Sequence, residues 1–334
     1  MELLQDIPWL IQQQASFIAD HQLSSGAIPW SQDSIITPWE HVECAIALDL
    51  SGRFHQATKA YMWLRDVQNP DGSWWSSYVN GRPKDLIKDA NYSSYIAVGL
   101  WCHYLATGDI DSLSQMWPSV ESGILFALHL QQPGGEIYWA CDASDAVHPV
   151  ALLAASSCTL LSIRCGIRIA KLLGQHKPDW NAASAKLARA IKECPEVFDD
   201  PGGDKYNYAM SWYYPVLTGV IKGKEAKRRI LSRWSDFVID DWGCKCVIEA
   251  PWWVTTAETC ELTLALMRID ERDKAKLLLN WLVKLQDHDG SFWTGMKLPE
   301  EQIWPEEKPT WASAAMILAA VAQLRDNKGA SYKL

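Results

Sequence analysis

The sequence VQNPDGSW at residues 67–74 returns as LQDHDGSFW at residues 285–293, and a weaker copy, LQQPGGEIYW, occupies residues 130–139. Each copy follows a helical pattern that ends in an apolar residue and glutamine, turns on glycine, and then places an aromatic residue. Glycine permits the positive φ angles of such turns, and aspartate accepts hydrogen bonds from nearby backbone N–H groups. We therefore expect Asp71 and Asp289 to form turns, and the recurrence indicates a protein built from repeated units.

Between these loops, apolar residues recur at three- and four-residue spacing, which predicts helices throughout. No convincing run of alternating residues predicts a strand. Six helix pairs fit the pattern. The first helices are expected to begin near Trp39, Asn91, Val150, Tyr206, Thr256 and Pro309. The second helices are expected near Phe54, Ser112, Asp179, Lys224 and Glu271, with residues 7–20 completing the set.

The two sets of helices differ in character. Segments 42–50 and 151–163 are apolar almost all round, whereas segments 177–192 and 271–284 carry charged faces. A helix that is apolar all round is buried on every side, and an amphipathic helix covers it. The pattern predicts an all-α fold in which residues 1–334 form a single domain, an (α/α)6 toroid of six helical hairpins in two concentric rings. An open solenoid is the structural alternative.

Composition narrows the class of protein. The chain has 334 residues, 48% of them hydrophobic and 21% charged, which is typical of a folded globular protein. Its net charge of −9 argues against nucleic acid as a partner, because phosphate binding needs a surplus of Lys and Arg. No long uninterrupted apolar run or leader pattern occurs, so we expect a cytoplasmic protein without a membrane partner. The nine cysteines form no CxxC pair, and we expect reduced thiols, no metal and no cofactor.

Tryptophan is the unusual residue, with 19 Trp against 6 Phe. Indole supplies a flat platform that suits sugar faces or cations, although it also fills cores. In a toroid, the inner helices converge at their N-terminal ends, and pockets form where several elements converge. Aromatic and polar residues cluster at these ends, although core packing or helix capping would also account for each of them. The substrate-binding candidates are Trp39, Glu40, His41, Asn91, Tyr92, His148, Trp212, Tyr213, Trp252, Trp253, Glu261 and Trp311.

Three carboxylates at the same ends are candidates for catalysis. Glu43 lies on a helix that should be buried, and burying an unpaired carboxylate is costly. Asp89 stands where a helix N-cap belongs, and capping alone would explain it. Glu258 follows Thr255 and Thr256 in a pattern that also resembles a capping box. Two carboxylates facing across a sugar-binding funnel would hydrolyse a glycosidic bond, one as acid and the other as base or nucleophile, with the assignment left open.

The repeated loops resemble those of the helical toroid superfamily, which includes terpene cyclases, protein prenyltransferases and six-hairpin glycosidases. The segments PWEHVE at 38–43, WCHYLATGD at 101–109 and TAETCEL at 256–262 are more similar to a bacterial group labelled prenyltransferase-like from its repeat. That group includes a hydrolase of methylmannose polysaccharide, an α-(1→4)-endomannanase. The resemblance implies a glycoside hydrolase acting on an α-linked oligo- or polysaccharide such as a mannan, with Glu43, Asp89 and Glu258 as its catalytic set.

Two alternatives stay open. A cyclase or prenyltransferase acting on an isoprenoid would use tryptophan to stabilise carbocations. However, the chain lacks the zinc-site spacing of prenyltransferases, and IDDW at 239–242 does not match the acidic motif of squalene-type cyclases. A non-catalytic carbohydrate-binding protein is the second alternative. The sequence also leaves open a calcium ion bound by loop acids such as Asp142 and Asp145.

Overall fold

The computed structural model describes residues 4–198 and 207–327, so the expected helix start at Tyr206 lies outside the described residues. The contacts divide the chain into two compact units. Unit 1 contains the described residues 4–21 and 207–327, and unit 2 contains the described residues 22–198. Helices dominate both units, and we describe each unit by itself.

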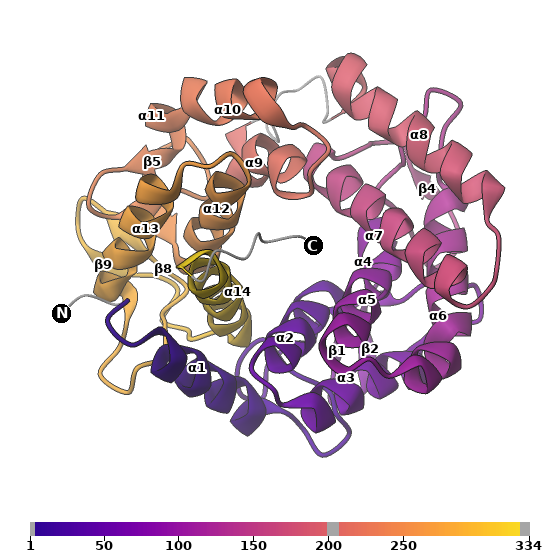
Figure 1. Ribbon diagram of the computed structural model, residues 1–334, viewed down its shortest axis with the longest axis horizontal. Coiled ribbons are helices and arrows are strands. Elements are labelled where there is room, and N and C mark those ends of the chain that lie inside the picture. The colour runs from indigo at the N-terminus through magenta and orange to yellow at the C-terminus, as the bar shows by residue number, and fades with distance from the viewer. Residues whose placement is uncertain (1–3, 199–206, 328–334) are drawn as a thin grey trace. The chain divides into compact units, whose positions relative to one another are not determined.

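Unit 2 consists of three helical hairpins (Figure 1). An inner row is formed by α2 (Pro38–Leu50), α5 (Ile96–Thr107) and α7 (Leu153–Leu172). An outer row is formed by α3 (Phe54–Val67), α6 (Ile110–His129) and α8 (Pro178–Glu193). Helix α5 packs against α2 and α7, and each outer helix packs against the inner helix that precedes it. Helix α7 is long and apolar enough to cross a membrane, but 72% of its most apolar stretch is buried inside the protein, as in a core helix.

Unit 1 repeats this arrangement (Figure 1). Its inner helices are α9 (Ala209–Leu217), α12 (Thr256–Arg268) and α14 (Thr310–Asn327). Its outer helices are α1 (Ile7–His21), α10 (Gly223–Ser232) and α13 (Arg272–Trp281). Helix α12 packs against α9 and α14, and the outer helices α10, α13 and α1 cover α9, α12 and α14 respectively. Apart from Tyr206, which lies outside the described residues, the helix starts lie within three residues of those predicted, except that the inner helix expected from Asn91 is divided into α4 (Ala90–Ser94) and α5, which starts at Ile96.

Short antiparallel strands, which the sequence analysis did not predict, lie in the connections between the helices. Unit 2 carries β1 (Trp75–Val79), β2 (Arg82–Asp89), β3 (Ala140–Cys141) and β4 (Val147–His148) in one sheet. Unit 1 carries the pair β5 (Val238–Ile239) and β6 (Gly243–Cys244), and the sheet β7 (Trp252–Thr255), β8 (Gly295–Leu298) and β9 (Gln302–Ile303). Strand β2 leads into the short helix α4 (Ala90–Ser94), and β7 leads into α12. These strands therefore position the residues that open the inner helices.

The three repeated loops follow the outer helices α3, α6 and α13, and each is hydrogen-bonded to another outer helix. Gln68 donates from Nε2 to Gly72 O at 2.9 Å and to Ser119 O of α6 at 3.0 Å. Gly72 has a φ angle of +89°, and a Cβ there would lie 2.3 Å from Ser122 O. Asp71 accepts from the backbone N–H and hydroxyl of the serine two residues on, which confirms its turn role. Gln131 with Gly135, and Gln286 with Gly290, repeat the glutamine contact across the turn.

A fourth copy of this loop escaped the sequence analysis. Gln22 donates to Gly26 O and to Gln56 O, both at 2.9 Å. A Cβ on Gly26 would lie 2.2 Å from Lys59 O, so this glycine also packs directly against the next outer helix. The segment HQLSSGAIPW at 21–30 has no Asp-Gly pair, and only the glutamine and glycine spacing links it to the others.

Candidate active site

Three carboxyl groups meet in unit 2, where the first turns of α2 lie near the junction of β2 and α4. Glu40 and Glu43 are three residues apart on α2, and Asp89 ends β2 and caps α4. The charges of Glu43 and Asp89 both raise the pKa of Glu40, which places the three groups within electrostatic reach of one another. The predicted candidates Glu43 and Asp89 thus come together, and Glu40 joins them.

The pKa of each of these three groups is raised to about 7. Burial is the largest cause in each case, because a low-dielectric surrounding disfavours the charged form. The Tyr95 hydroxyl donates a hydrogen bond to Glu43 Oε1, which acts in the opposite direction and lowers the pKa of Glu43. A carboxyl group that keeps its proton near neutral pH is what general acid catalysis of glycoside cleavage requires.

Several polar atoms of this cluster are not engaged. Asp89 caps α4 through Oδ1 alone, which accepts from the backbone N–H of Asn91 at 2.7 Å and of Tyr92 at 3.0 Å. Among the described residues, the buried atoms Glu40 Oε2 and Asn91 Oδ1 have no hydrogen-bond partner. Buried polar groups are normally paired, so unpaired ones at a cluster of carboxyls mark a place for a polar ligand.

Aromatic residues surround these carboxyl groups. Trp39 stacks on Tyr95 with ring centroids 5.4 Å apart. The pKa of Tyr92 is raised well above its ordinary value, first by the charge of Glu40 and then by burial and by Asp89. His148 is half-buried on β4, with its ring 5.4 Å from that of Trp139. Capping therefore explains one oxygen of Asp89, while its surroundings have the polar and aromatic character of a sugar site.

A second pair of carboxylates lies in unit 1 on α12. Glu258 and Glu261 are 6% and 5% exposed. Tyr213 donates to Glu261 Oε2, and Tyr214 donates to Oε1 at 2.6 Å. Because both oxygens of Glu261 accept hydrogen bonds from α9, this side chain is held in place by the packing of α9 against α12. Glu261 was predicted to contact substrate, and joining α9 to α12 is an alternative, structural role for it.

Glu258 does not form the capping box that its spacing from Thr255 suggested. Thr255 is the N-cap of α12 but makes no side-chain hydrogen bond to the backbone of the first turn. Its hydroxyl donates instead to Glu258 Oε2. Burial and the charge of Glu258 raise the pKa of Cys246. The physical reason is geometric: the Thr255 hydroxyl is directed to the Glu258 carboxylate rather than to a backbone N–H of the first turn.

Two predicted substrate-binding residues have packing roles. His41 is 1% exposed, and its Nδ1 accepts from the backbone N–H of Ile28 while Nε2 lies 2.9 Å from Ala60 O. Burial lowers the pKa of His41 to about 4, so both nitrogens serve the backbone as a neutral ring. Trp212 is 1% exposed and stacks on Phe237 with centroids 4.9 Å apart. Both side chains are therefore engaged in packing, and almost none of either ring is exposed to solvent.

The remaining tryptophan candidates differ in exposure. Trp311 is buried at the start of α14 with 8% of its surface exposed. Trp252 is 44% exposed and Trp253 is half-buried, both on β7. Of the five tryptophans singled out from the sequence, the two on β7 are therefore the best placed to meet a ligand from solvent.

Three residues of these clusters were missed by the sequence analysis: Tyr95, Tyr214 and Cys246. Tyr95 is separated from Glu43 by 52 residues, and only the packing of α5 against α2 brings them together. The one available signal was indirect. A carboxylate on an apolar helix needs a buried hydrogen-bond donor, and tyrosine is a frequent donor of that kind.

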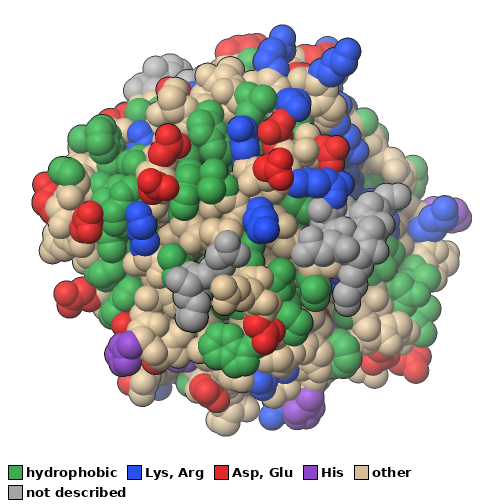
Figure 2. Space-filling view, turned by 60° about the vertical axis from the view of Figure 1, so that its left-hand side comes forward, with side chains coloured by type: hydrophobic (Ala, Val, Ile, Leu, Met, Phe, Trp, Pro, Cys, Tyr) green, Lys and Arg blue, Asp and Glu red, His purple; other side chains and the backbone are tan. Residues whose placement is uncertain are grey.

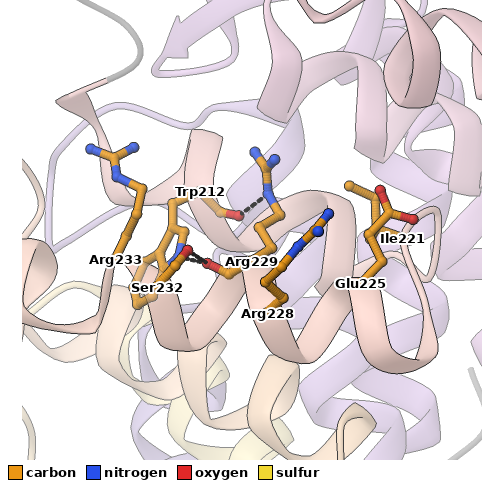
Figure 3. A pocket seen from close by; sticks show the side chains of 7 residues that line it. All are labelled: Trp212, Ile221, Glu225, Arg228, Arg229, Ser232 and Arg233. Atoms are coloured by element: carbon orange, nitrogen blue, oxygen red, sulfur yellow. Dashed lines mark hydrogen bonds between the residues drawn. The ribbon is translucent and has the colours of Figure 1, made fainter.

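A pocket of about 290 Å³ in unit 1 has a different character (Figure 3). Its lining is Trp212, Ile221, Glu225, Arg228, Arg229, Ser232 and Arg233. Figure 3 shows Arg229 bonded through Nε to the carbonyl of Trp212, at 2.8 Å. The lining holds one carboxylate, Glu225, on an outer helix, and so it lacks the carboxylate pair that glycosidic cleavage needs.

Loop acids do not gather as metal ligands in the part of the chain that the structure describes. Asp142 accepts from the backbone of Ser144 and Ala146 in its own turn. Asp145 forms an ion pair with Lys88, which also pairs with Asp71 at 2.9 Å. The described residues contain no group of three or more His, Cys, Asp or Glu side chains that could hold a metal ion.

Comparison with solved structures shows the fold. The GH63 mannosylglycerate hydrolase of Thermus thermophilus superposes with a TM-score of 0.73 and 11% identity, covering 92% of this chain and 99% of that one. A D-mannose isomerase superposes with a TM-score of 0.74 and 9% identity, covering 96% and 97%. The fold is the (α/α)6 toroid that glycosidases and sugar epimerases share. At these identities the likeness concerns the fold alone.

Comparison with curated proteins gives the family. No family model matches the chain. The MMP endo-(1,4)-3-O-methyl-alpha-D-mannosidase of Mycolicibacterium hassiacum is 42% identical over 322 residues, which are 96% of this chain and 88% of that protein. The chain belongs to the family of this mannosidase and is a glycoside hydrolase. This finding favours the hydrolase over the isoprenoid and non-catalytic alternatives.

Proposed function

We propose that this enzyme cleaves internal α-(1→4) bonds in a polymer of 3-O-methylmannose. The 42% identity with the M. hassiacum endomannosidase over nearly the whole chain carries the proposal. The carboxyl groups of unit 2 and the aromatic residues beside them supply the chemistry that such a substrate needs. Carboxyl groups exchange protons with the glycosidic oxygen and with water, and aromatic rings contact the faces of the sugar.

The catalytic candidates are Glu43, Asp89 and Glu258, as predicted from the sequence. One protonated carboxyl donates its proton to the glycosidic oxygen as the bond to the anomeric carbon breaks. A second, ionised carboxylate either takes a proton from the attacking water or bonds to the anomeric carbon itself. Glu43 and Asp89 suit the first role, because their pKa values of about 7 let a sizeable fraction stay protonated at neutral pH.

The deciding experiment is product analysis with defined substrates. The purified protein is incubated with α-(1→4)-linked 3-O-methylmannose oligosaccharides, with unmethylated oligosaccharides of the same linkage, and with isoprenoid diphosphates. Internal cleavage of the methylated oligosaccharides into shorter oligosaccharides is expected. Release of single sugars from one end would contradict the endo mode, and turnover of the isoprenoid alone would overturn the proposal.

Isosteric variants then test the three carboxyl groups one by one. We expect Glu43→Gln, Asp89→Asn or Glu258→Gln to lower kcat by about 10² to 10⁴ where the group acts in proton transfer. Glu136→Gln is the matched control, because Glu136 lies outside both clusters, in the loop that follows α6. Near-normal kcat in all three variants would rule out this catalytic set while leaving the substrate assignment intact.

A further inference from the structure

The sheet β7–β8–β9 of unit 1 gathers two tryptophans and a lysine on one face. Trp253 on β7 stands opposite Lys297 on β8, which stands opposite Gln302 on β9. Trp304 directly follows β9, and its N–H donates to Gly295 O at 3.0 Å. Because successive side chains on a strand point to opposite faces, Trp253, Lys297 and Trp304 share a face. We call these three residues the tryptophan corner.

Glycine at position 295 lets the indole of Trp253 lie across the sheet. A Cβ at this position would be 2.6 Å from Trp253 Nε1, so any side chain there would displace the ring. From this position Trp253 Nε1 donates to Trp304 O at 2.8 Å. The indole of Trp253 is thus fixed against the backbone of β8 on one side and tied to the residue after β9.

The second indole stands almost perpendicular to the first. The ring centroids of Trp253 and Trp304 are 5.0 Å apart with an interplanar angle of 78°. The Lys297 ammonium lies 3.9 Å from the centroid of the Trp304 ring, and Trp304 is still 41% exposed. Figure 2 brings forward the side of unit 1 that carries β9 and α13, where hydrophobic side chains reach the surface among charged ones.

Two fixed, perpendicular indoles meet the shape of a substituted sugar better than that of a flat apolar partner. A pyranose presents a C–H face that stacks on an aromatic ring, and its substituents project from the ring edge. A floor from Trp253 and a wall from Trp304 would contact the face and an edge substituent at once. A methyl ether is apolar and gains from contact with the indole face of the wall, whereas a free hydroxyl against that face would lose water without a hydrogen-bond partner in the ring.

We propose that the tryptophan corner is a sugar subsite that selects a 3-O-methylated mannosyl unit of the polymer. This inference rests on the proposed function and adds the residues that read the methyl group. Strand β7 runs directly into α12, and the five residue-to-residue steps from Trp253 to Glu258 span at most about 18 Å. The corner therefore lies within a few sugar units of one catalytic candidate, as an enzyme that binds along a chain requires.

The test compares Trp304→Ala and Trp304→Phe with Trp9→Ala. Trp304 is held through its backbone N–H and carbonyl, which the substitutions retain. Trp9 on α1 is 57% exposed and belongs to neither cluster nor corner, so it controls for loss of a surface indole. Oligosaccharide affinity is measured by titration calorimetry, and KM and kcat are measured with methylated and unmethylated α-(1→4)-mannose oligosaccharides.

We expect Trp304→Ala to raise the Kd and KM for the methylated oligosaccharide about tenfold with little change in kcat, and Trp304→Phe to restore part of the loss. One methyl contact corresponds to about fourfold in affinity, so the preference for the methylated ligand should fall by about that factor. Equal affinities in the Trp304 and Trp9 variants would overturn the inference, as would a change in oligomeric mass on Trp304→Ala. Absence of cleavage by the unmodified enzyme would instead refute the proposed function. The affinities for methylated and unmethylated oligosaccharides would still show whether the tryptophan corner binds the methylated sugar.

Discussion

Removing the Tyr95 hydroxyl tests directly which part Glu43 plays in the reaction. Tyr95 donates a hydrogen bond to Glu43 Oε1, and this bond lowers the pKa of a carboxyl that burial has raised to about 7. A hydrogen bond to a charged group is worth about 1.5 to 3 kcal/mol, which corresponds to about one to two pH units. Tyr95→Phe keeps the ring that stacks on Trp39 and is therefore expected to move the pKa of Glu43 upward by that amount.

The pH dependence of kcat/KM reports the shift. If Glu43 must be protonated to donate a proton, the alkaline limb of the profile moves to higher pH in Tyr95→Phe. If Glu43 must be ionised as base or nucleophile, the acidic limb moves to higher pH instead. The limb that moves thus assigns the role of Glu43. Because the neighbouring carboxyls titrate together with Glu43, each observed pKa belongs to the cluster of three carboxyls.

Tyr78→Phe is the matched control, because Tyr78 is 1% exposed in the same unit and bonds to the backbone of Trp75 rather than to a candidate carboxyl. Its profile should coincide with that of the unmodified enzyme. The reasoning is refuted if both limbs stay in place in Tyr95→Phe while Glu43→Gln is inactive. In that case the hydroxyl would not control the ionisation of an essential group.

Two further predictions concern stability. Asp89→Asn should retain the cap of α4 and remove a group whose folded pKa of about 7 exceeds its ordinary value of 3.8. The folded protein holds this proton more tightly than the unfolded chain, so Asp89 lowers the free energy of unfolding by up to about 4 kcal/mol as pH rises from about 4 to 7. Urea unfolding at pH 4, 5.5 and 7 should therefore show a free energy of unfolding that depends less on pH in the variant than in the unmodified enzyme. Equal pH dependence in the two proteins would contradict this. Gly72→Ala should cost roughly 2 to 4 kcal/mol, because its Cβ would lie 2.3 Å from Ser122 O at a φ of +89°. Gly52→Ala, at a φ of +82° with nothing within 4 Å, should cost only about 1 kcal/mol, and equal midpoints of thermal unfolding would show that the close contact is relieved.

The helical repeat could be predicted from the sequence because its signals are local. A helix such as α7 is apolar on several sides, and its partner α8 has one charged face, so the two rows separate by composition alone. Strands β3 and β4 could not be predicted, because they have two residues each and alternation needs a longer run. Strand β2 has eight residues, but its two large apolar side chains, Leu86 and Ile87, are adjacent and do not alternate with polar ones. Two of the pairings, β2 with β3 and β7 with β8, also join segments more than 40 residues apart in the chain.

The candidate site was predictable in part for the same reason. Glu43 stands out as a carboxylate on an apolar helix, and burial cost alone identifies it. Its partner Tyr95 depends on how α5 packs against α2, which no spacing in the sequence specifies. Trp212 and Tyr213 are adjacent aromatic residues, and the sequence does not distinguish their roles. In the structure Trp212 packs on Phe237, whereas Tyr213 donates a hydrogen bond to Glu261.

The hydrogen bonds also change the order of the carboxyl candidates. A group that acts on a substrate needs an oxygen that the protein itself does not engage. Both oxygens of Glu261 accept from tyrosines, whereas Glu40 Oε2 has no hydrogen-bond partner among the described residues and Asp89 caps α4 through Oδ1 alone. Glu40, which the sequence suggested only as a binding residue, therefore calls for the same isosteric substitution as Asp89. A loss of kcat in Glu40→Gln without a change in KM would move it into the catalytic set, because ground-state binding would be intact.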